Sequence, residues 1–157
     1  MKLRRQAVDI GLVVRNRDEM MRFYGEGLGL ERIFSESPPP DVLPPARTVQ
    51  TYQAGEAAIK LWHIHEYTPP AGPDERLGQV GFRYLTMWID DLAETVARLT
   101  EHGFPVDDKP HRSVLGAAMS LCFVRDPDGN YIELIETDDP SGKLKHDFPG
   151  VAAEFAD

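Results

Sequence analysis

The fold is decided by the stretch Arg125-Asp126-Pro127-Asp128-Gly129-Asn130-Tyr131-Ile132-Glu133-Leu134-Ile135-Glu136. Its proline fixes φ, Asp128 can bond its own backbone, and its glycine accepts a positive φ, so Asp-Pro-Asp-Gly predicts a tight turn. Strand-like sequence lies on both sides of this turn, at 119–124 and 131–136. The whole segment therefore predicts a β-hairpin.

Glu133 is the unusual residue of the second strand. Side chains alternate between the faces of a strand, so Ile132 and Leu134 share one face and Glu133 lies on the other. A carboxylate among apolar neighbours either points to water or is held in a polar cavity, because burying an unpaired charge is costly. Glu133 is therefore the first candidate for a functional residue.

Composition limits the possible functions. At 157 residues the chain is long enough for one domain or two small modules that share a core. Its formal net charge of −9 argues against an electrostatic grip on nucleic acid or on an anionic membrane. Cys122 is the single cysteine, so no intramolecular disulfide is possible. With no secretory signal and no apolar run of membrane length, the expected location is the cytoplasm.

One pattern occurs twice in the chain. A strand-like run, a helix that starts after Asn16 or Asp91, and a closing hairpin return in the same order about 75 residues later. Each half reads βαβββ, and a proline-rich segment joins the two halves. The expected organisation is a first module at 7–66, a linker at 67–79, a second module at 80–137 and a tail at 138–157.

Three features together resemble the vicinal oxygen chelate superfamily, which includes glyoxalase I, the bleomycin-resistance proteins and the extradiol dioxygenases. They are the two βαβββ halves, the segment Phe23-Tyr24-Gly25 followed by Leu28-Gly29-Leu30, and the ending Asp-Pro-Asp-Gly-Asn-Tyr-Ile-Glu-Leu. The resemblance covers about residues 7–137. It implies an α+β fold of two tandem βαβββ modules whose sheets curl into a U-shaped cavity, often within a homodimer.

The metal-dependent relatives hold their ion with four inward-facing residues, on the first and last strands of each module. Matching the motifs carries these positions onto Asp9, Lys60, Tyr84 and Glu133, of which only Glu133 keeps a usual ligand type. An ammonium group has no lone pair, and at about 4 Å it repels a divalent ion by roughly 8 kcal/mol at an effective dielectric near 20. Lys60 therefore argues against a conventional four-ligand metal site, and the sequence identifies no cofactor.

Two arrangements of these residues remain open. In a metal-free cavity, Lys60 pairs with Glu133 or Asp9 and stabilises a developing oxyanion, while Glu133 abstracts a proton and Tyr84 donates one. If the register is one residue off, His63 takes the ligand place, and Asp9, His63 and Glu133 form a three-ligand metal set. The plainer interpretation makes His63 a partly exposed residue at the end of a strand.

Four further residues are candidates for substrate binding. Trp62 and Trp88 suit packing, although either can form an aromatic wall of a cavity. His111 and Arg112 lie on a loop that the resemblance places over the cavity mouth. Arg112 can meet an anionic group of a substrate, and a solvated loop charge is the alternative.

The function that follows is that of a lyase or isomerase acting on a small oxygenated metabolite. The alternative is a non-catalytic protein that binds and sequesters an antibiotic-type compound, which the missing ligands and the proline-rich loop at 35–47 favour. A ferrous dioxygenase is disfavoured because Tyr84 stands in a ligand position. In every case the partner is a small molecule, bound by a homodimer.

Overall fold

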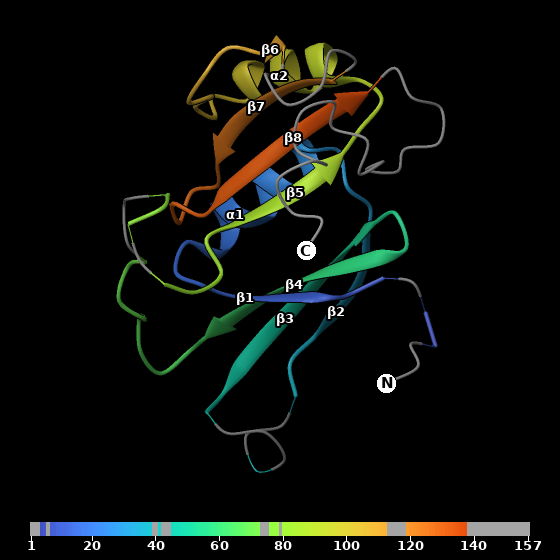
Figure 1. The fold of residues 1–157 in the computed structure, drawn as a ribbon. Coiled ribbons are helices and arrows are strands. Elements are labelled where there is room, and N and C mark those ends of the chain that lie inside the picture. The colour runs from blue at the N-terminus through green and yellow to red at the C-terminus, as the bar shows by residue number, and fades with distance from the viewer. Residues whose placement is uncertain are drawn as a thin grey trace, which may run out of the picture.

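The structure is a computed structural model that describes residues 4–5, 7–38, 41, 45–72, 76–78, 80–112 and 119–137. It contains two four-stranded sheets, one above the other in Figure 1. The elements of the first sheet and its helix are β1 (Ile10–Val14), α1 (Arg17–Arg22), η1 (Phe23–Gly27), β2 (Arg32–Glu36), β3 (Arg47–Ala54) and β4 (Ala57–Ile64). Those of the second are β5 (Tyr84–Trp88), α2 (Leu92–Glu101), β6 (His111–Arg112), β7 (Met119–Arg125) and β8 (Tyr131–Thr137).

The two sheets have the same topology. Their strand orders are β1-β4-β3-β2 and β5-β8-β7-β6. In each, the first strand pairs in parallel with the last, and the remaining pairs are antiparallel. This repetition confirms the predicted α+β fold of two tandem βαβββ modules. The predicted tail at 138–157 lies outside the described residues.

The helix that the sequence predicted after Asn16 is not regular along its length. After α1 the chain widens into the π-helical turn η1, where the amide of Leu28 donates to the carbonyl of Phe23 at 2.8 Å. The wider turn buries Phe23, Tyr24 and Gly27 together. A Cβ on Gly27 would lie 2.9 Å from the Leu99 side chain, so glycine lets η1 approach α2.

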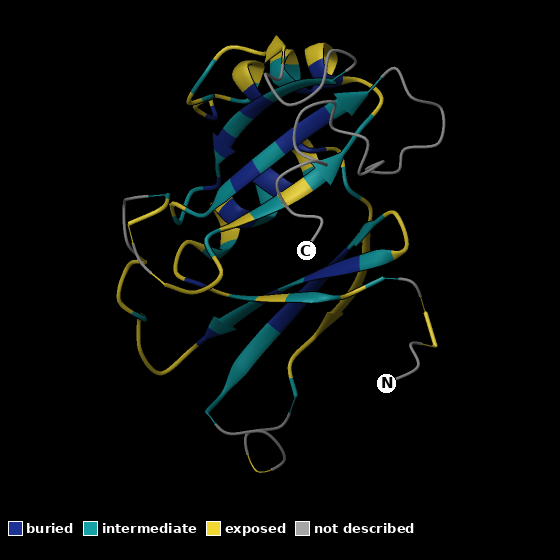
Figure 2. Cartoon of the chain, viewed as in Figure 1, coloured by how far each residue is buried: buried dark blue, intermediate teal, exposed yellow. Residues whose placement is uncertain are grey.

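The core is shared between the two modules. Among the residues that the structure describes, fifteen buried ones form one cluster, which includes Tyr24 from η1, Leu61 from β4, Leu99 from α2 and Leu134 from β8. The strands supply it by alternation, and β8 changes between buried and half-buried residues along its length (Figure 2). No helix in the described part of the chain has the length and apolar character needed to cross a membrane.

The Asp-Pro-Asp-Gly turn is held by Asp126, where the sequence suggested that Asp128 would bond its own backbone. One carboxylate oxygen of Asp126 accepts from the amides of Asp128, at 3.1 Å, and Asn130, at 2.9 Å. The other oxygen accepts from the Asn130 side chain at 2.8 Å and from the Tyr24 hydroxyl at 3.1 Å. Tyr24 belongs to the first module, so this buried carboxylate joins the two modules.

Asp128 makes a second bridge between the modules. Its carboxylate accepts from the amide of Arg15 at 2.6 Å, and from the side chain and amide of Asn16 at 2.8 and 3.2 Å. Arg15 and Asn16 directly precede α1, and the amide of Asn16, at the N-cap position, lacks a partner within the helix. Asp128 therefore caps a helix that is more than a hundred residues away in sequence.

Candidate functional site

Glu133 lies on the open face of the β5–β8 sheet. The buried side chains of Ile132 and Leu134 point to the core, which confirms the predicted alternation along β8. On the open face, Glu133 is in register with Thr86 of β5 and Phe123 of β7. The Thr86 hydroxyl donates to Glu133 Oε2 at 2.8 Å and so orients the carboxylate, and in the described part of the chain no hydrogen bond is made to the other oxygen.

Tyr84 shares this open face. It lies two residues before Thr86 on β5 and is in register with Tyr131 of β8. Its ring packs edge-on against Phe123, with the ring centroids 5.6 Å apart, and the residue is 44% exposed. Beside the Glu133 carboxylate there is thus an aromatic surface that carries a phenol hydroxyl, which can donate a proton.

Asp9 and Lys60 form an ion pair on the β1–β4 sheet. Lys60 Nζ lies 3.3 Å from Asp9 Oδ2, and the Ala58 amide donates to Asp9 Oδ1 at 3.0 Å. Arg5 also bonds this carboxylate. Desolvation raises the pKa of Asp9, but the hydrogen bonds from Lys60, Ala58 and Arg5 outweigh it and hold the pKa below its ordinary value.

The four positions therefore form two pairs, one on each sheet. Asp9 contacts Lys60, while Tyr84 and Glu133 belong to neighbouring strands of the other sheet. Among the described residues, no hydrogen bond or ion pair joins one pair to the other. Convergence of all four residues around one cavity remains a prediction.

Comparison with known proteins identifies the family. The model of the Glyoxalase/Bleomycin resistance protein/Dioxygenase superfamily matches residues 6–134. The chain belongs to this superfamily. A probable lactoylglutathione lyase from Synechocystis is 27% identical over 124 residues, which cover 79% of this chain and 89% of that protein. The chloroplastic probable lactoylglutathione lyase of Arabidopsis thaliana is 26% identical over 133 residues, 85% of this chain but only 36% of that longer protein.

Solved structures show the same fold at low identity. A glyoxalase family protein from Bacillus cereus superposes with a TM-score of 0.67 at 23% identity, over 87% of this chain and 96% of that one. A glyoxalase I variant from Zea mays gives 0.65 at 20% identity, over 84% of this chain and 44% of that one. At such identities the likeness shows a shared glyoxalase fold and leaves the activity open.

The residues at the four positions that the resemblance assigned to a metal do not suit a divalent ion. Lys60 holds the Asp9 carboxylate with a positive charge, and no three His, Cys, Asp or Glu side chains gather as a metal site in the described ranges. The three-residue alternative is not assembled either. His63 is in register with Val14 near α1, on the face opposite to Lys60, and neither Asp9 nor Glu133 is near it in the sheet pairing. No step of a reaction is therefore assigned to a metal.

His63 instead lies in a polar region close to α1. Desolvation lowers its pKa, and the neighbouring positive groups His65 and Arg17 lower it further. Its ring centroid is 5.5 Å from that of His65, which in turn lies 3.5 Å from the Thr48 hydroxyl. The structure thus supports the plainer interpretation, in which His63 is a half-buried residue at the end of β4.

The other predicted binding residues are spread over the molecule. Trp62 is half-buried on the Lys60 face, with the Arg47 guanidinium 5.9 Å from its ring. Trp88, also half-buried, lines a cavity of about 250 Å³ between β5 and the β3–β4 hairpin. His111 is in register with Leu121 on the open face of β6, whereas Arg112 pairs with Ser120 and so belongs to the opposite face.

Two residues near Glu133, Arg76 and Thr86, were missed by sequence reasoning. Arg76, in the predicted linker, places its guanidinium carbon 3.8 Å from the centroid of the Phe123 ring. No local pattern around Arg76 announces this contact, because it depends on the path of a segment rich in proline and glycine. Thr86 was within reach of the alternation argument, since it lies two residues after Tyr84 on the same strand.

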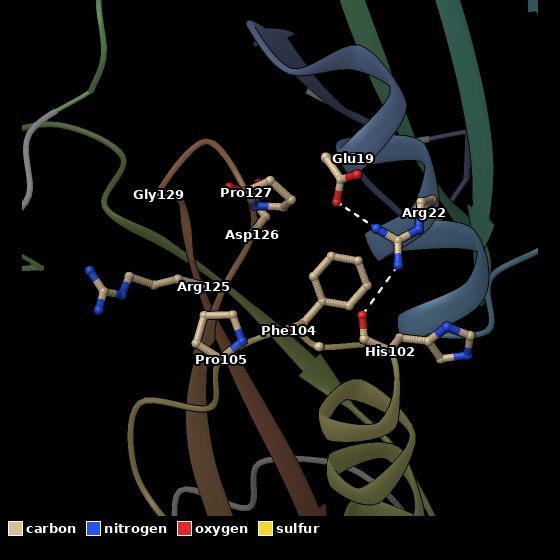
Figure 3. Close-up of a pocket in the computed structure, with 10 residues that line it drawn as sticks. Glu19, Arg22, His102, Phe104, Pro105, Arg125, Asp126, Pro127 and Gly129 are labelled. Atoms are coloured by element: carbon tan, nitrogen blue, oxygen red, sulfur yellow. Dashed lines mark hydrogen bonds and ion pairs between the residues drawn. The ribbon is translucent and has the colours of Figure 1, made fainter.

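A separate hollow of about 420 Å³ lies where the modules meet (Figure 3). Within it Arg22 points between two partners, donating to Glu19 Oε2 at 2.7 Å and to the His102 carbonyl at 3.2 Å, and it stacks over Phe104. Arg125 points away from it. Because the central cation is already satisfied by protein groups, we interpret this hollow as a structural junction.

Proposed function

We propose that this superfamily member is a glyoxalase-like lyase or isomerase that acts on a small oxygenated metabolite by acid–base chemistry without a bound metal. The observation that carries the proposal is the ion pair of Lys60 with Asp9, in the place where relatives hold an ion. A lysine fixed by a carboxylate supplies the positive charge that a metal would otherwise supply to a developing oxyanion.

The roles of the side chains follow from their chemistry. Glu133, oriented by Thr86, abstracts a proton from the carbon next to a carbonyl group of the substrate. The electron pair moves onto the oxygen, where Lys60 stabilises the charge and Tyr84 donates a proton. Return of the proton to another carbon, or loss of a leaving group, completes an isomerisation or an elimination.

This scheme needs both pairs in one site, and we propose that a homodimer provides it. Each pair lies on an open sheet face, and a second copy can cover the Glu133 face of one chain with the Lys60 face of another. Complementation tests the arrangement. Lys60→Met and Glu133→Gln proteins, each inactive alone, should regain part of the activity when they are mixed and allowed to exchange subunits. Failure of all mixtures, with exchange verified, would place each complete site within one chain.

Exchange of substrate protons with solvent tests the chemistry directly. The protein is incubated in deuterated water with lactoylglutathione, the compound in the relatives' names, and with a set of small 2-hydroxy and 2-oxo compounds. NMR then measures the incorporation of deuterium at the carbon next to the carbonyl group. We expect the protein to catalyse exchange and the Glu133→Gln variant to lose it. The control variant Glu136→Gln, whose changed residue lies on the opposite face of the same strand, should retain exchange.

Metal independence needs its own measurement. Exchange should survive dialysis against a chelator, and purified protein should hold no stoichiometric divalent metal. In the Lys60→Glu variant the repulsion is removed, so binding of manganese or nickel should increase. Stoichiometric metal in the unaltered protein, lost in Asp9→Asn, would contradict the proposal.

The second candidate is a binding protein that sequesters a planar compound. The exposed ring of Tyr84 favours it, because stacking on an aromatic ring gives affinity without chemistry. Tight bleomycin binding that survives Glu133→Gln, together with no deuterium exchange for any compound, would establish this function instead. In either case the single reduced Cys122 agrees with a cytoplasmic protein.

A further inference from the structure

Arg76 is held over the open face that carries Glu133. Its guanidinium carbon lies 3.8 Å from the Phe123 ring centroid and 6.0 Å from that of Tyr131. Phe123 is the register partner of Glu133 on the neighbouring strand. The carbonyl of Arg76 accepts a hydrogen bond from Arg83 Nε at 3.2 Å, which fixes the backbone at this point. A cation from the segment between the modules is thus stacked on the ring that stands beside the proposed base in the sheet.

The charge of Arg76 is available to a ligand. Among the described residues, no carboxylate lies within ion-pair distance of its guanidinium. Arg125 makes a useful contrast, because it also stacks on Tyr131, at 5.6 Å, but its Nε bonds Asp107 at 2.9 Å. Stacking occupies the flat face of the Arg76 guanidinium and leaves its edge N–H groups free for a bidentate contact.

We propose that Arg76 binds the anionic end, a carboxylate or a phosphate, of the molecule that occupies the Glu133 face. The substrate class is then small oxygenated anions, with the reacting carbon at Glu133 and the negative group at Arg76. The assignment of a substrate rests on the proposed function, whereas the anion contact itself does not. In a chain of net charge −9, an anion needs such a fixed local cation to overcome the overall repulsion.

Arg76 takes the role that the sequence suggested for Arg112. Arg112 lies on β6, two strands from Glu133, and on the opposite face of the sheet. Arg76 lies on the correct face, because its guanidinium stacks on Phe123 of β7 and lies near Tyr131 of β8, and both rings belong to the Glu133 face. A cation held by aromatic rings is also pre-oriented, so little conformational entropy is lost when an anion binds.

Isothermal titration at low ionic strength tests the contact with three probes. Lactate presents a carboxylate, phosphoglycolate presents a phosphate as well, and lactamide is the neutral counterpart of lactate. We expect both anions to bind the full-length protein, and Arg76→Gln to weaken them by about tenfold or more. Arg76→Lys keeps the charge but loses the planar guanidinium, so it should lose less anion affinity than Arg76→Gln. Lactamide should bind the unaltered protein and both variants with equal affinity. The anion that binds more tightly identifies whether the site prefers a carboxylate or a phosphate.

The matched control is Arg32→Gln. It removes the same charge from an exposed position on β2 in the other sheet, and it should leave anion affinity within about twofold of the unaltered protein. Circular dichroism verifies that each variant is folded. Three results would overturn the inference. In the first, Arg76→Gln weakens anion binding no more than Arg32→Gln does, and in the second it weakens lactamide binding as much as anion binding. In the third, neither anion binds the unaltered protein at millimolar concentration.

The two proposals fail in different ways. If Arg76→Gln abolishes anion binding while no compound shows deuterium exchange, Arg76 is confirmed as an anion site and the catalytic function falls. If Glu133→Gln abolishes exchange while Arg76→Gln changes neither anion affinity nor KM, catalysis stands and the anion site falls.

Discussion

Replacing Asp128 with alanine should destabilise the whole molecule, although Asp128 lies in a turn at the surface. Its carboxylate accepts three hydrogen bonds from Arg15 and Asn16, two of them from backbone amides at the start of α1. The shortest is 2.6 Å, and all three cross from the second module to the first. The change therefore removes a helix cap and a connection between the modules at once.

The size of the effect can be estimated from these contacts. A hydrogen bond within a protein contributes about 0.5–1.5 kcal/mol net, and loss of a helix cap costs about 0.5–2 kcal/mol. Three bonds in a partly solvated position argue for the lower part of the range, since water replaces the carboxylate at the freed amides. We expect Asp128→Ala to lower the free energy of unfolding by about 2 kcal/mol. Asp128→Asn, which keeps an acceptor but loses the charge, should lose about half as much.

Urea denaturation followed by circular dichroism and tryptophan fluorescence measures this loss. The matched control is Glu56→Ala, which removes a carboxylate from the exposed turn of the equivalent hairpin in the first module and should cost less than about 0.5 kcal/mol. Both probes should give the same midpoint, because the two modules share one core. If Asp128→Ala costs no more than Glu56→Ala, the carboxylate does not join the modules in solution and the estimate is refuted.

Three further predictions concern the core. Gly27→Ala should cost about 1–3 kcal/mol, because its Cβ would lie 2.9 Å from Leu99, whereas Gly25→Ala, with its nearest contact at 3.4 Å, should be nearly neutral in the same urea titration. Burial raises the folded pKa of Asp126 above 3.8, so its contribution to stability is full below that value and is lost as pH rises through the folded pKa. The stability difference between the unaltered protein and Asp126→Asn should therefore shrink as the pH rises above 3.8, and a constant difference would contradict this. Burial also raises the pKa of the Cys122 thiol to about 11, so iodoacetamide should label it in urea but not in the folded protein, as mass spectrometry can check.

The strands and their faces were predictable because they depend on local sequence. The alternation along β8 put Ile132 and Leu134 in the core and Glu133 on the open face, as observed. Both helices begin near the predicted capping residues, at Arg17 and Leu92. These features follow from side-chain direction and backbone preference within a few residues, which the sequence displays directly.

Contacts between distant segments were not predictable in the same way. Neither Asn16 nor Asp91 makes a side-chain cap, although each occupies the N-cap position. At the first helix, the Asp128 carboxylate accepts hydrogen bonds from the amides of Arg15 and Asn16. At the second helix, the Glu136 carboxylate accepts one from the amide of Leu92 at 3.4 Å. The stacking of Arg76 is of the same kind. Such contacts depend on how the modules pack, and no local pattern encodes that packing.

The turn that fixes the fold also fixes the candidate base. The hydrogen bonds of Asp126 to Asp128 and Asn130 set where β8 begins, and so set its register against β5 and β7. A slip of one residue would turn Glu133 into the core and expose Leu134, which would cost both apolar burial and the desolvation of a charge. The register is therefore strongly specified, and Glu133 stays beside Thr86 for the same reason that the hairpin folds. Changes in the turn should for this reason affect stability and proton exchange together, whereas changes at Lys60 should affect exchange alone.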